Sequence, residues 1–212
     1  MNTLVHIPAA GAVVEGMLQI PDDAVGLALF AHGSGSSRHS PRNNYVAEVL
    51  RTARVGTLLM DLLTPMEDRD HARRFDIDLL TRRLLDAARW AATGGATRML
   101  PLGFFGASTG AAAALEAAAE LGETARAVVS RGGRPDLASP QALARVTAPT
   151  LLLVGGHDTG VIDLNRQAYD RLRCKKELAI VPGATHLFEE PGTLDAVAAR
   201  AAGWFAEHLP VR

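Results

Sequence analysis

The chain has 212 residues and a mass of 22.4 kDa, with 48% hydrophobic and 21% charged residues, as expected for one globular domain with a buried core. Its 22 Lys and Arg residues nearly balance its 23 Asp and Glu residues, and the formal net charge is -1. This balance excludes a strong overall attraction to nucleic acid or to an anionic membrane, so we expect neither as a partner.

The chain also lacks the sequence features of secreted and membrane proteins. Cys174 is the single cysteine, which excludes an intramolecular disulfide. No basic segment precedes an apolar stretch at the N-terminus, and no window approaches the roughly 18 apolar residues of a membrane span. No linker, repeat or low-complexity tract divides the chain. We therefore expect a cytoplasmic protein that forms one domain over residues 1–212.

Strand-like and helical segments alternate along the chain. Residues 4–7 and 13–20 are two β-like runs, which predict a hairpin at a sheet edge. Strand-like runs follow at 26–31, 55–60, 99–105, 127–129, 150–154 and 178–181, and helical patterns lie at 41–54, 75–93, 111–121 and 194–208. Short apolar strands between amphipathic helices are typical of a mostly parallel sheet covered on both faces, so the predicted fold class is α/β. The stretch 131–149 is too short to form a covering domain, which predicts a fairly open site.

One motif follows a predicted strand and opens a predicted helix. Residues 106–110 read Gly-Ala-Ser-Thr-Gly, the G-x-S-x-G pattern of a nucleophile elbow. In such an elbow the serine lies in a strained turn, and flanking glycines let the strand and helix pass closely. The pattern therefore predicts Ser108 as a catalytic nucleophile.

A serine hydroxyl needs a base to accept its proton, and the base needs an anchor. Asp158 follows the predicted strand 150–154, and His186 follows the strand 178–181. Both lie at the carboxyl ends of strands and in the order Ser, acid, His of elbow enzymes. We predict the triad Ser108, Asp158 and His186. The alternative for His186 is a loop histidine that caps the helix beginning near Pro191.

The loop after the first long strand contains His32-Gly33-Ser34-Gly35. Small residues there let main-chain amides approach a substrate carbonyl, so we predict an oxyanion hole formed by the N–H groups of Ser34 and Thr109. A phosphate-binding loop is the alternative. The chain lacks the Gly-Lys-Ser/Thr ending of a P-loop and the spacing of a dinucleotide-binding motif, which argues against it.

Basic residues cluster in the predicted strand-end loops: Arg38, His39, Arg42, Arg131 and Arg134. Arginine binds carboxylates and phosphates with a planar fork, which favours an anionic substrate. We predict that His32, Arg38 and Arg131 contact the substrate. The alternative is that such residues pair with local acids such as Asp136 or stay solvated.

Together the segments His32–Gly35, Gly106–Gly110, Gly156–Asp158 and Thr185–His186 resemble the α/β-hydrolase superfamily, most closely the small, lid-less members of the dienelactone hydrolase family. The resemblance implies an α/β-hydrolase fold with a central, mostly parallel eight-stranded sheet flanked by helices and no large lid domain. It also implies a hydrolase site without a cofactor. True dienelactone hydrolases use a cysteine where this chain has Ser108, and their glutamate near the oxyanion strand is replaced by His32-Gly33, so we do not expect dienelactone itself as the substrate.

These features predict a serine hydrolase that cleaves a small ester or lactone through an acyl-enzyme. An acyltransferase with the same triad and a non-catalytic binding module with the same fold are the alternatives. We expect no metal, because the seven histidines form no H-E-x-x-H motif. The sequence makes no prediction of oligomeric state.

Overall fold

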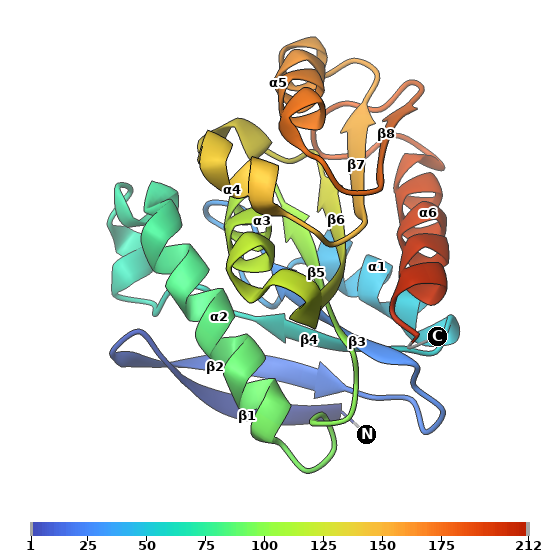
Figure 1. Cartoon of the computed structure of the whole chain (residues 1–212). Coiled ribbons are helices and arrows are strands. Elements are labelled where there is room, and N and C mark those ends of the chain that lie inside the picture. The colour runs from blue at the N-terminus through green and yellow to red at the C-terminus, as the bar shows by residue number, and fades with distance from the viewer. Residues whose placement is uncertain (1, 211–212) are drawn as a thin grey trace.

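The computed structural model describes residues 2–210, which fold around one eight-stranded sheet (Figure 1). The strands are β1 (Asn2–Ala9), β2 (Ala12–Gln19), β3 (Gly26–Ala31), β4 (Val55–Met60), β5 (Leu102–Ala107), β6 (Ala125–Arg131), β7 (Thr150–Gly155) and β8 (Lys176–Val181). Their order is β1-β2-β4-β3-β5-β6-β7-β8. β1 and β2 form an antiparallel hairpin, β2 pairs antiparallel with β4, and every other neighbouring pair is parallel.

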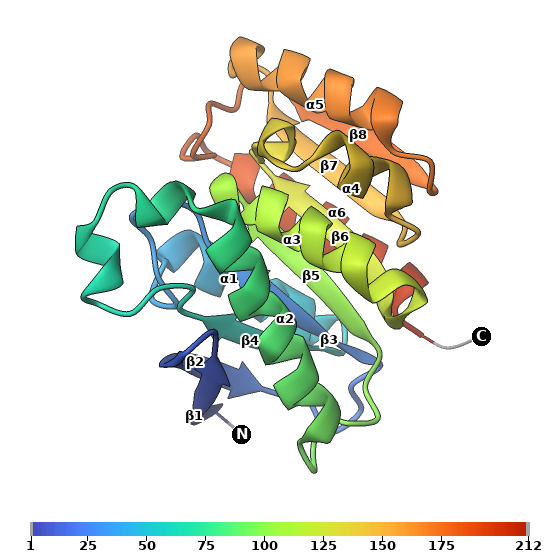
Figure 2. The same ribbon diagram turned by 60° about the vertical axis from the view of Figure 1, so that its left-hand side comes forward.

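Helices cover both faces of the sheet. They are α1 (Pro41–Thr52), α2 (Ile77–Thr93), α3 (Thr109–Leu121), α4 (Pro140–Arg145), α5 (Thr159–Arg171) and α6 (Thr193–His208), with 3-10 turns η1 (Glu67–Arg69), η2 (Arg73–Phe75), η3 (Gly122–Thr124) and η4 (Pro135–Leu137). Figure 2 shows α2, α3, α4 and α5 on one face, with α1 and α6 behind the sheet. Each face has its own apolar cluster, one packed under α2 and α3 and the other under α1 and α6.

The burial of the strands explains why their sequences were recognisable. Every residue of β3, β4, β5 and β7 is buried, as in parallel strands covered on both faces, and their sequences are therefore nearly continuous apolar runs. β8 lies at the edge of the sheet and alternates between buried and more exposed residues. The predicted α/β fold, its edge hairpin and its eight-stranded sheet are confirmed.

Several element predictions need correction. The strand predicted from residue 99 begins at Leu102, because Met99 is 83% exposed and belongs to the preceding loop. The helix predicted from residue 75 begins at Ile77, because the side chain of Asp76 accepts a hydrogen bond from the amide of Leu79 and caps the helix. Helices α4 and α5 were not predicted. Helix α4 has only six residues, and α5 buries only Ile162, Asn165 and Ala168 and has no broad apolar face.

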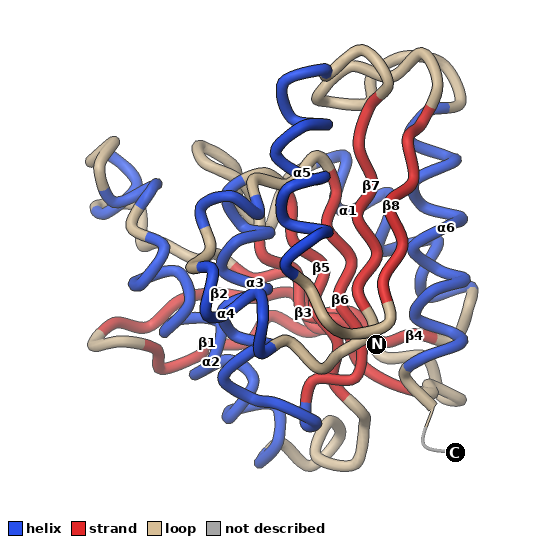
Figure 3. The backbone as a smooth tube through the Cα atoms, turned by 45° about the horizontal axis from the view of Figure 1, so that its top comes forward, coloured by secondary structure: helices blue, strands red, loops and turns tan. Residues whose placement is uncertain are grey.

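The carboxyl ends of the parallel strands meet at one edge of the sheet. In Figure 3 the loops that follow β7 and β8 lie beyond the ends of these strands. The two loops are in contact, because the amide of His157 donates a hydrogen bond to the carbonyl oxygen of Ala184 at 2.9 Å. The predicted site residues lie on or next to the loops at this edge, where ligands bind in open α/β sheets.

Candidate active site

Ser108 occupies a sharp turn between β5 and α3. Its backbone has φ 49° and ψ −122°, a conformation that non-glycine residues rarely adopt and that is often found at functional sites. A Cβ atom on Gly110 would lie 2.2 Å from the carbonyl oxygen of Ala31 and 2.5 Å from that of His32. Only glycine therefore lets the start of α3 contact the end of β3, and this contact brings Ser108 beside the loop after β3.

The loops after β7 and β8 bring Asp158 and His186 together. Nδ1 of His186 lies 2.6 Å from Oδ2 of Asp158, a short, charge-assisted distance. The Asp158 side chain is 18% exposed and that of His186 is 39% exposed. A Cβ on Gly155 would lie 2.5 Å from the carbonyl oxygen of Ala184, so the close approach of the two loops requires glycine there. With Nδ1 engaged by Asp158, the other ring nitrogen of His186 is left for a proton acceptor role.

The segment after β6 connects the Ser108 turn with the His186 loop. The amide of Ser108 donates to the carbonyl oxygen of Arg131 at 3.3 Å, and the amide of Arg134 donates to the carbonyl oxygen of Ser108 at 3.0 Å. Between them, Gly132 lies against His186, because a Cβ there would be 3.6 Å from Cε1 of the imidazole. Ser108 and His186 therefore border one short piece of backbone, and Asp158 joins them through its contact with His186.

The two predicted oxyanion donors flank Ser108. Thr109 is the first residue of α3, and the first amides of a helix have no acceptor within the helix. Ser34 is exposed in the loop after β3. Its neighbour Gly33 packs against the nucleophile, since a Cβ on Gly33 would lie 2.9 Å from Cβ of Ser108 and 3.7 Å from its Oγ. Ser34 and Thr109 line the same small hollow, together with Gly33.

His32 has a different role from the substrate contact predicted from the sequence. It is only 6% exposed. Its Nδ1 contacts the carbonyl oxygen of Gly33 at 2.9 Å, and the amide of Leu62 donates to its Nε2 at 2.9 Å. Burial lowers the pKa of His32, which outweighs the opposing effects of the Gly33 carbonyl and of the charges on Asp61 and Asp68. The neutral ring therefore uses both nitrogens to fix the loop after β3 and has none left for a substrate.

Arg38 also has internal partners in place of the predicted substrate. Its guanidinium forms ion pairs with both Asp61 and Glu15. Its amide donates to Oδ1 of Asp61 at 2.8 Å. These contacts occupy the charge of Arg38 and tie the loop to the middle of β2 and to the residue after β4. The predicted substrate contact of this residue is therefore not supported.

The other basic residues of the region differ in their pairing. Arg134 forms a two-pronged pair with Asp136, at 2.8 Å and 2.7 Å, which was the alternative considered for it. Arg42 donates to Glu189 at 3.0 Å. Arg131 is 8% exposed, and its Nη1 has no hydrogen-bond partner. It is the one predicted substrate-binding residue whose charged group is left without a partner among the described residues.

Sequence analysis missed one wall of the site, residues 61–76 between β4 and α2. A small hollow beside the predicted oxyanion donors is lined by His32, Gly33, Ser34, Gly35, Leu62, Leu63, Asp68, Arg74, Leu80 and Thr109. This segment is anchored by the fully buried Arg83, whose Nη2 donates to Glu67 at 2.8 Å and 3.0 Å. The mixed acidic and basic residues of 67–74 were the available signal. Their charges alone do not show which side chains point toward the protein interior.

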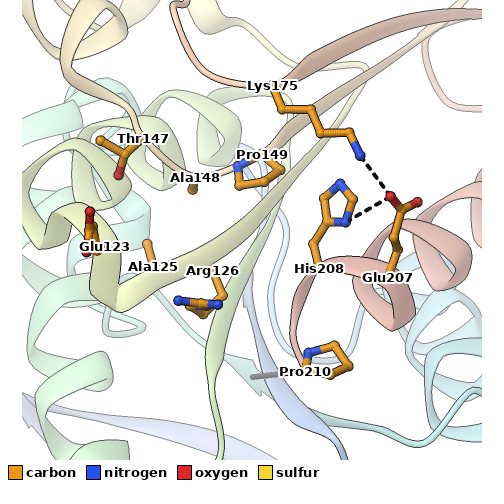
Figure 4. Close-up of a pocket in the computed structure, with 10 residues that line it drawn as sticks. All are labelled: Glu123, Ala125, Arg126, Thr147, Ala148, Pro149, Lys175, Glu207, His208 and Pro210. Carbon is orange, nitrogen blue, oxygen red and sulfur yellow. Dashed lines mark hydrogen bonds and ion pairs between the residues drawn. The ribbon is translucent and has the colours of Figure 1, made fainter. Parts of the chain in front are cut away.

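A larger hollow of about 520 Å³ lies elsewhere, at the amino-terminal ends of β6 and β7 (Figure 4). Lys175, Glu207 and His208 line it, and Glu207 contacts both neighbours. None of the predicted site residues lines this hollow. The volume of a hollow therefore does not identify the candidate active site in this protein.

Residues 2–210 contain no group of three or more His, Cys, Asp or Glu side chains suited to hold a metal ion. No helix in this part of the chain combines the length and apolar character needed to cross a membrane.

Comparison with known proteins gives a near relative of known structure. Dienelactone hydrolase from Anabaena variabilis is 54% identical, with a TM-score of 0.95 over 99% of this chain and 98% of that chain. Est1E from Butyrivibrio proteoclasticus has a TM-score of 0.82 at 16% identity, covering 96% of this chain and 98% of Est1E. The esterase domain of a Rhodothermus marinus protein has a TM-score of 0.79 at 17% identity and covers 99% of both chains. The last two similarities concern the fold alone.

Curated relatives add a different name. Two proteins of Mycobacterium tuberculosis, named as candidate phosphoribosyl transferases, are 57% identical over 205 residues, which is 97% of this chain. This chain spans only 46% of their length. No family model matches the chain.

Proposed function

The chain belongs to the dienelactone hydrolase family of α/β-hydrolases, and from this membership and the geometry around Ser108 we propose that it hydrolyses a small carboxylic ester or lactone. The observation that carries the proposal is the 2.6 Å contact between His186 and Asp158 at the same sheet edge as the strained Ser108 turn. An acid, a base and a hydroxyl in this relation are the requirements of acyl transfer through a covalent intermediate.

In the proposed reaction, Oγ of Ser108 attacks the substrate carbonyl carbon while His186 accepts the hydroxyl proton. The resulting oxyanion receives hydrogen bonds from the amides of Ser34 and Thr109. His186 then donates its proton to the leaving alcohol, and the acyl group remains on Ser108. Water attacks this ester with His186 again as the base, which releases the acid and regenerates the hydroxyl. Asp158 holds the imidazole in the required tautomer throughout.

The phosphoribosyl transferase name is not carried to this chain. It describes proteins of which the chain spans 46%, and fold or length alone does not transfer a function. The near relative covered along almost its whole length is a dienelactone hydrolase. We infer a hydrolytic site that needs no cofactor, acting on a small molecule.

The test is active-site labelling with a fluorophosphonate, read by mass spectrometry. We expect one adduct, on Ser108, and its absence in Ser108→Ala. Ser37→Ala, in the loop after β3, is the matched control and should still be labelled. An adduct on another residue, or none, would contradict the proposal.

Two alternatives are separated by a turnover assay. With 4-nitrophenyl acetate, a hydrolase releases nitrophenol continuously, and Ser108→Ala should lower kcat by roughly 10⁴ to 10⁶. A non-catalytic binding module would give no turnover. With an acceptor alcohol or amine added, an acyltransferase would transfer most of the acetyl group to the acceptor, whereas a hydrolase would release mostly free acetate.

A further inference from the structure

Arg131 stands out among the charged residues of the protein. Of the residues that the structure describes, two arginines are buried, Arg83 and Arg131. Arg83 is paired with Glu67. Arg131 has no ion pair and no side-chain hydrogen bond, and its Nη1 is shielded from solvent without a partner. A buried cation without a partner is strongly destabilising, so it needs a specific reason to be there.

The surroundings of Arg131 add positive charge. The desolvation that accompanies burial, together with the nearby charge of Arg42, lowers the pKa of Arg131 to about 10. The group therefore stays charged at neutral pH despite both effects. Arg42 lies in the first turn of α1, which contains no acidic residue, and the N-terminus of a helix itself favours an anion. The region thus holds two guanidinium groups beside a helix start.

The acid that pairs with Arg42 leaves Arg131 without a counter-charge. Glu189 accepts a hydrogen bond from Nη1 of Arg42, but its side chain is 62% exposed. No contact joins Glu189 to Arg131. By contrast, Arg38 and Arg134 on the neighbouring loops both have carboxylate partners. Among Arg38, Arg42, Arg131 and Arg134, only Arg131 lacks a carboxylate partner in the described structure.

Arg131 also adjoins the proposed catalytic residues. It is the last residue of β6, and its carbonyl oxygen accepts the amide of Ser108. The next residue, Gly132, lies against the ring of His186. Strand alternation places Arg131 on the same face as Val129, which packs in the cluster under α1 and α6. A group bound by Arg131 would therefore lie on the α1 side of the reacting ester.

We propose that Arg131, assisted by Arg42, binds an oxyanion of the substrate, a carboxylate or a phosphate, on the α1 side of Ser108. The proposal rests on the hydrolase function proposed above and names the class of ester that it acts on. An oxyanion would supply the acceptors that the guanidinium lacks, in the two-pronged geometry that arginine favours. The substrate is then an ester that carries a negative charge on its acyl or its alcohol part.

The first experiment measures binding of simple anions. Melting temperatures are recorded with sodium phosphate or sodium acetate against sodium chloride at equal ionic strength. We expect phosphate, acetate or both to raise the melting temperature of the native protein but not that of Arg131→Met. Arg126→Met is the matched control, because Arg126 lies at the opposite end of β6 and its loss changes the net charge equally. The control should keep the shift.

The same variants test the role in catalysis. Two pairs of esters are compared. Mono(4-nitrophenyl) glutarate and 4-nitrophenyl pentanoate have the same five-carbon acyl chain, with and without a terminal carboxylate. The acetate esters of 3-hydroxybenzoate and of phenol differ by a carboxylate on the alcohol part. For at least one pair, Arg131→Met should lower the ratio of kcat/KM for the charged over the neutral ester by roughly 10-fold to 100-fold, as expected for loss of a charge-assisted pair. Arg126→Met should leave the ratio unchanged.

The outcomes separate this proposal from the proposed function. If both variants keep the charge ratios and the anion shift, the anion site is wrong, whereas labelling of Ser108 and hydrolysis of 4-nitrophenyl acetate would still support the hydrolase. If phosphate gives a shift and acetate none, the group is a phosphate, and the reverse identifies a carboxylate. If Arg131→Met does not fold, Arg131→Lys is used in its place. A native kcat/KM ratio for charged over neutral esters together with a native melting-temperature shift would overturn the two-pronged contact. A reduction of either quantity supports it.

Discussion

Nδ1 of His186 lies 2.6 Å from Oδ2 of Asp158, although 28 residues separate them in the chain. The contact depends on two loops that are held together by the hydrogen bond from His157 to Ala184. Replacement of the carboxylate alone should therefore alter the imidazole without moving the loops, which makes Asp158 a clean site for a test.

Asp158→Asn should lower kcat for 4-nitrophenyl acetate by about 10⁴, because a carboxamide no longer enforces the tautomer in which the other ring nitrogen accepts a proton. Asp163→Asn on α5 is the control. Asp163 is exposed and pairs with Arg166, and such surface pairs contribute little. Steady-state kinetics of both variants measure the effect. Equal kcat values for Asp158→Asn and Asp163→Asn would argue against Asp158 as the triad acid.

The proposed oxyanion donor at position 34 is a main-chain amide, so the side chain of Ser34 should be dispensable. Ser34→Ala should keep kcat within a few-fold, whereas Ser34→Pro, which lacks the N–H, should lower it by roughly 10² to 10³. The melting temperatures of both variants report whether the loop remains folded. A comparable loss in Ser34→Ala would instead assign the function to the hydroxyl group.

Gly110→Ala should be strongly destabilising, because the new methyl group would meet the carbonyl oxygens of Ala31 and His32 at 2.2 Å and 2.5 Å. We expect a loss of about 1–3 kcal/mol in the free energy of unfolding, as for other overpacked sites. Gly203→Ala within α6 meets no atom within 4 Å and should stabilise by about 0.5–1 kcal/mol. Urea unfolding of the two variants should give changes of opposite sign.

Glu67→Gln should destabilise the protein by about 3–5 kcal/mol, since it leaves the fully buried Arg83 without its anion. Burial would raise the pKa of Glu67, but hydrogen bonds from Thr64 and the charge of Arg83 outweigh it and keep the pKa low. Glu177→Gln removes an exposed pair with Arg200 and should change the free energy of unfolding by less than about 1 kcal/mol. Similar values for the two variants in denaturant unfolding would exclude a structural role for the buried pair.

Acid should destabilise the protein in part through His32. Its pKa in the folded state lies below the ordinary value of 6.5, so the unfolded chain binds the proton more readily. Stability from this group is complete above pH 6.5 and falls as the pH drops below it. The melting temperature of the native protein should therefore decline more between pH 7.5 and pH 5 than that of His32→Gln. Parallel curves would show that His32 does not titrate in this way.

The sequence predicted the sheet well because its inner strands are buried on both faces and are apolar throughout. It also predicted which loops would meet, because parallel strands bring their carboxyl ends to one edge. It could not predict side-chain partners. Arg38, Arg131 and Arg134 looked alike as loop arginines, yet one pairs with Asp61, one has no partner and one pairs with Asp136.

The hydrogen bond from Leu62 to His32 has a practical consequence. An amide proton shared with an imidazole nitrogen at 2.9 Å has a distinctive chemical environment and is protected from exchange with water. The same ring contacts Gly33, whose neighbour is the proposed oxyanion donor Ser34. The nuclear magnetic resonance signal of the Leu62 amide thus reports whether the oxyanion loop is ordered, and it can be read without substrate or turnover.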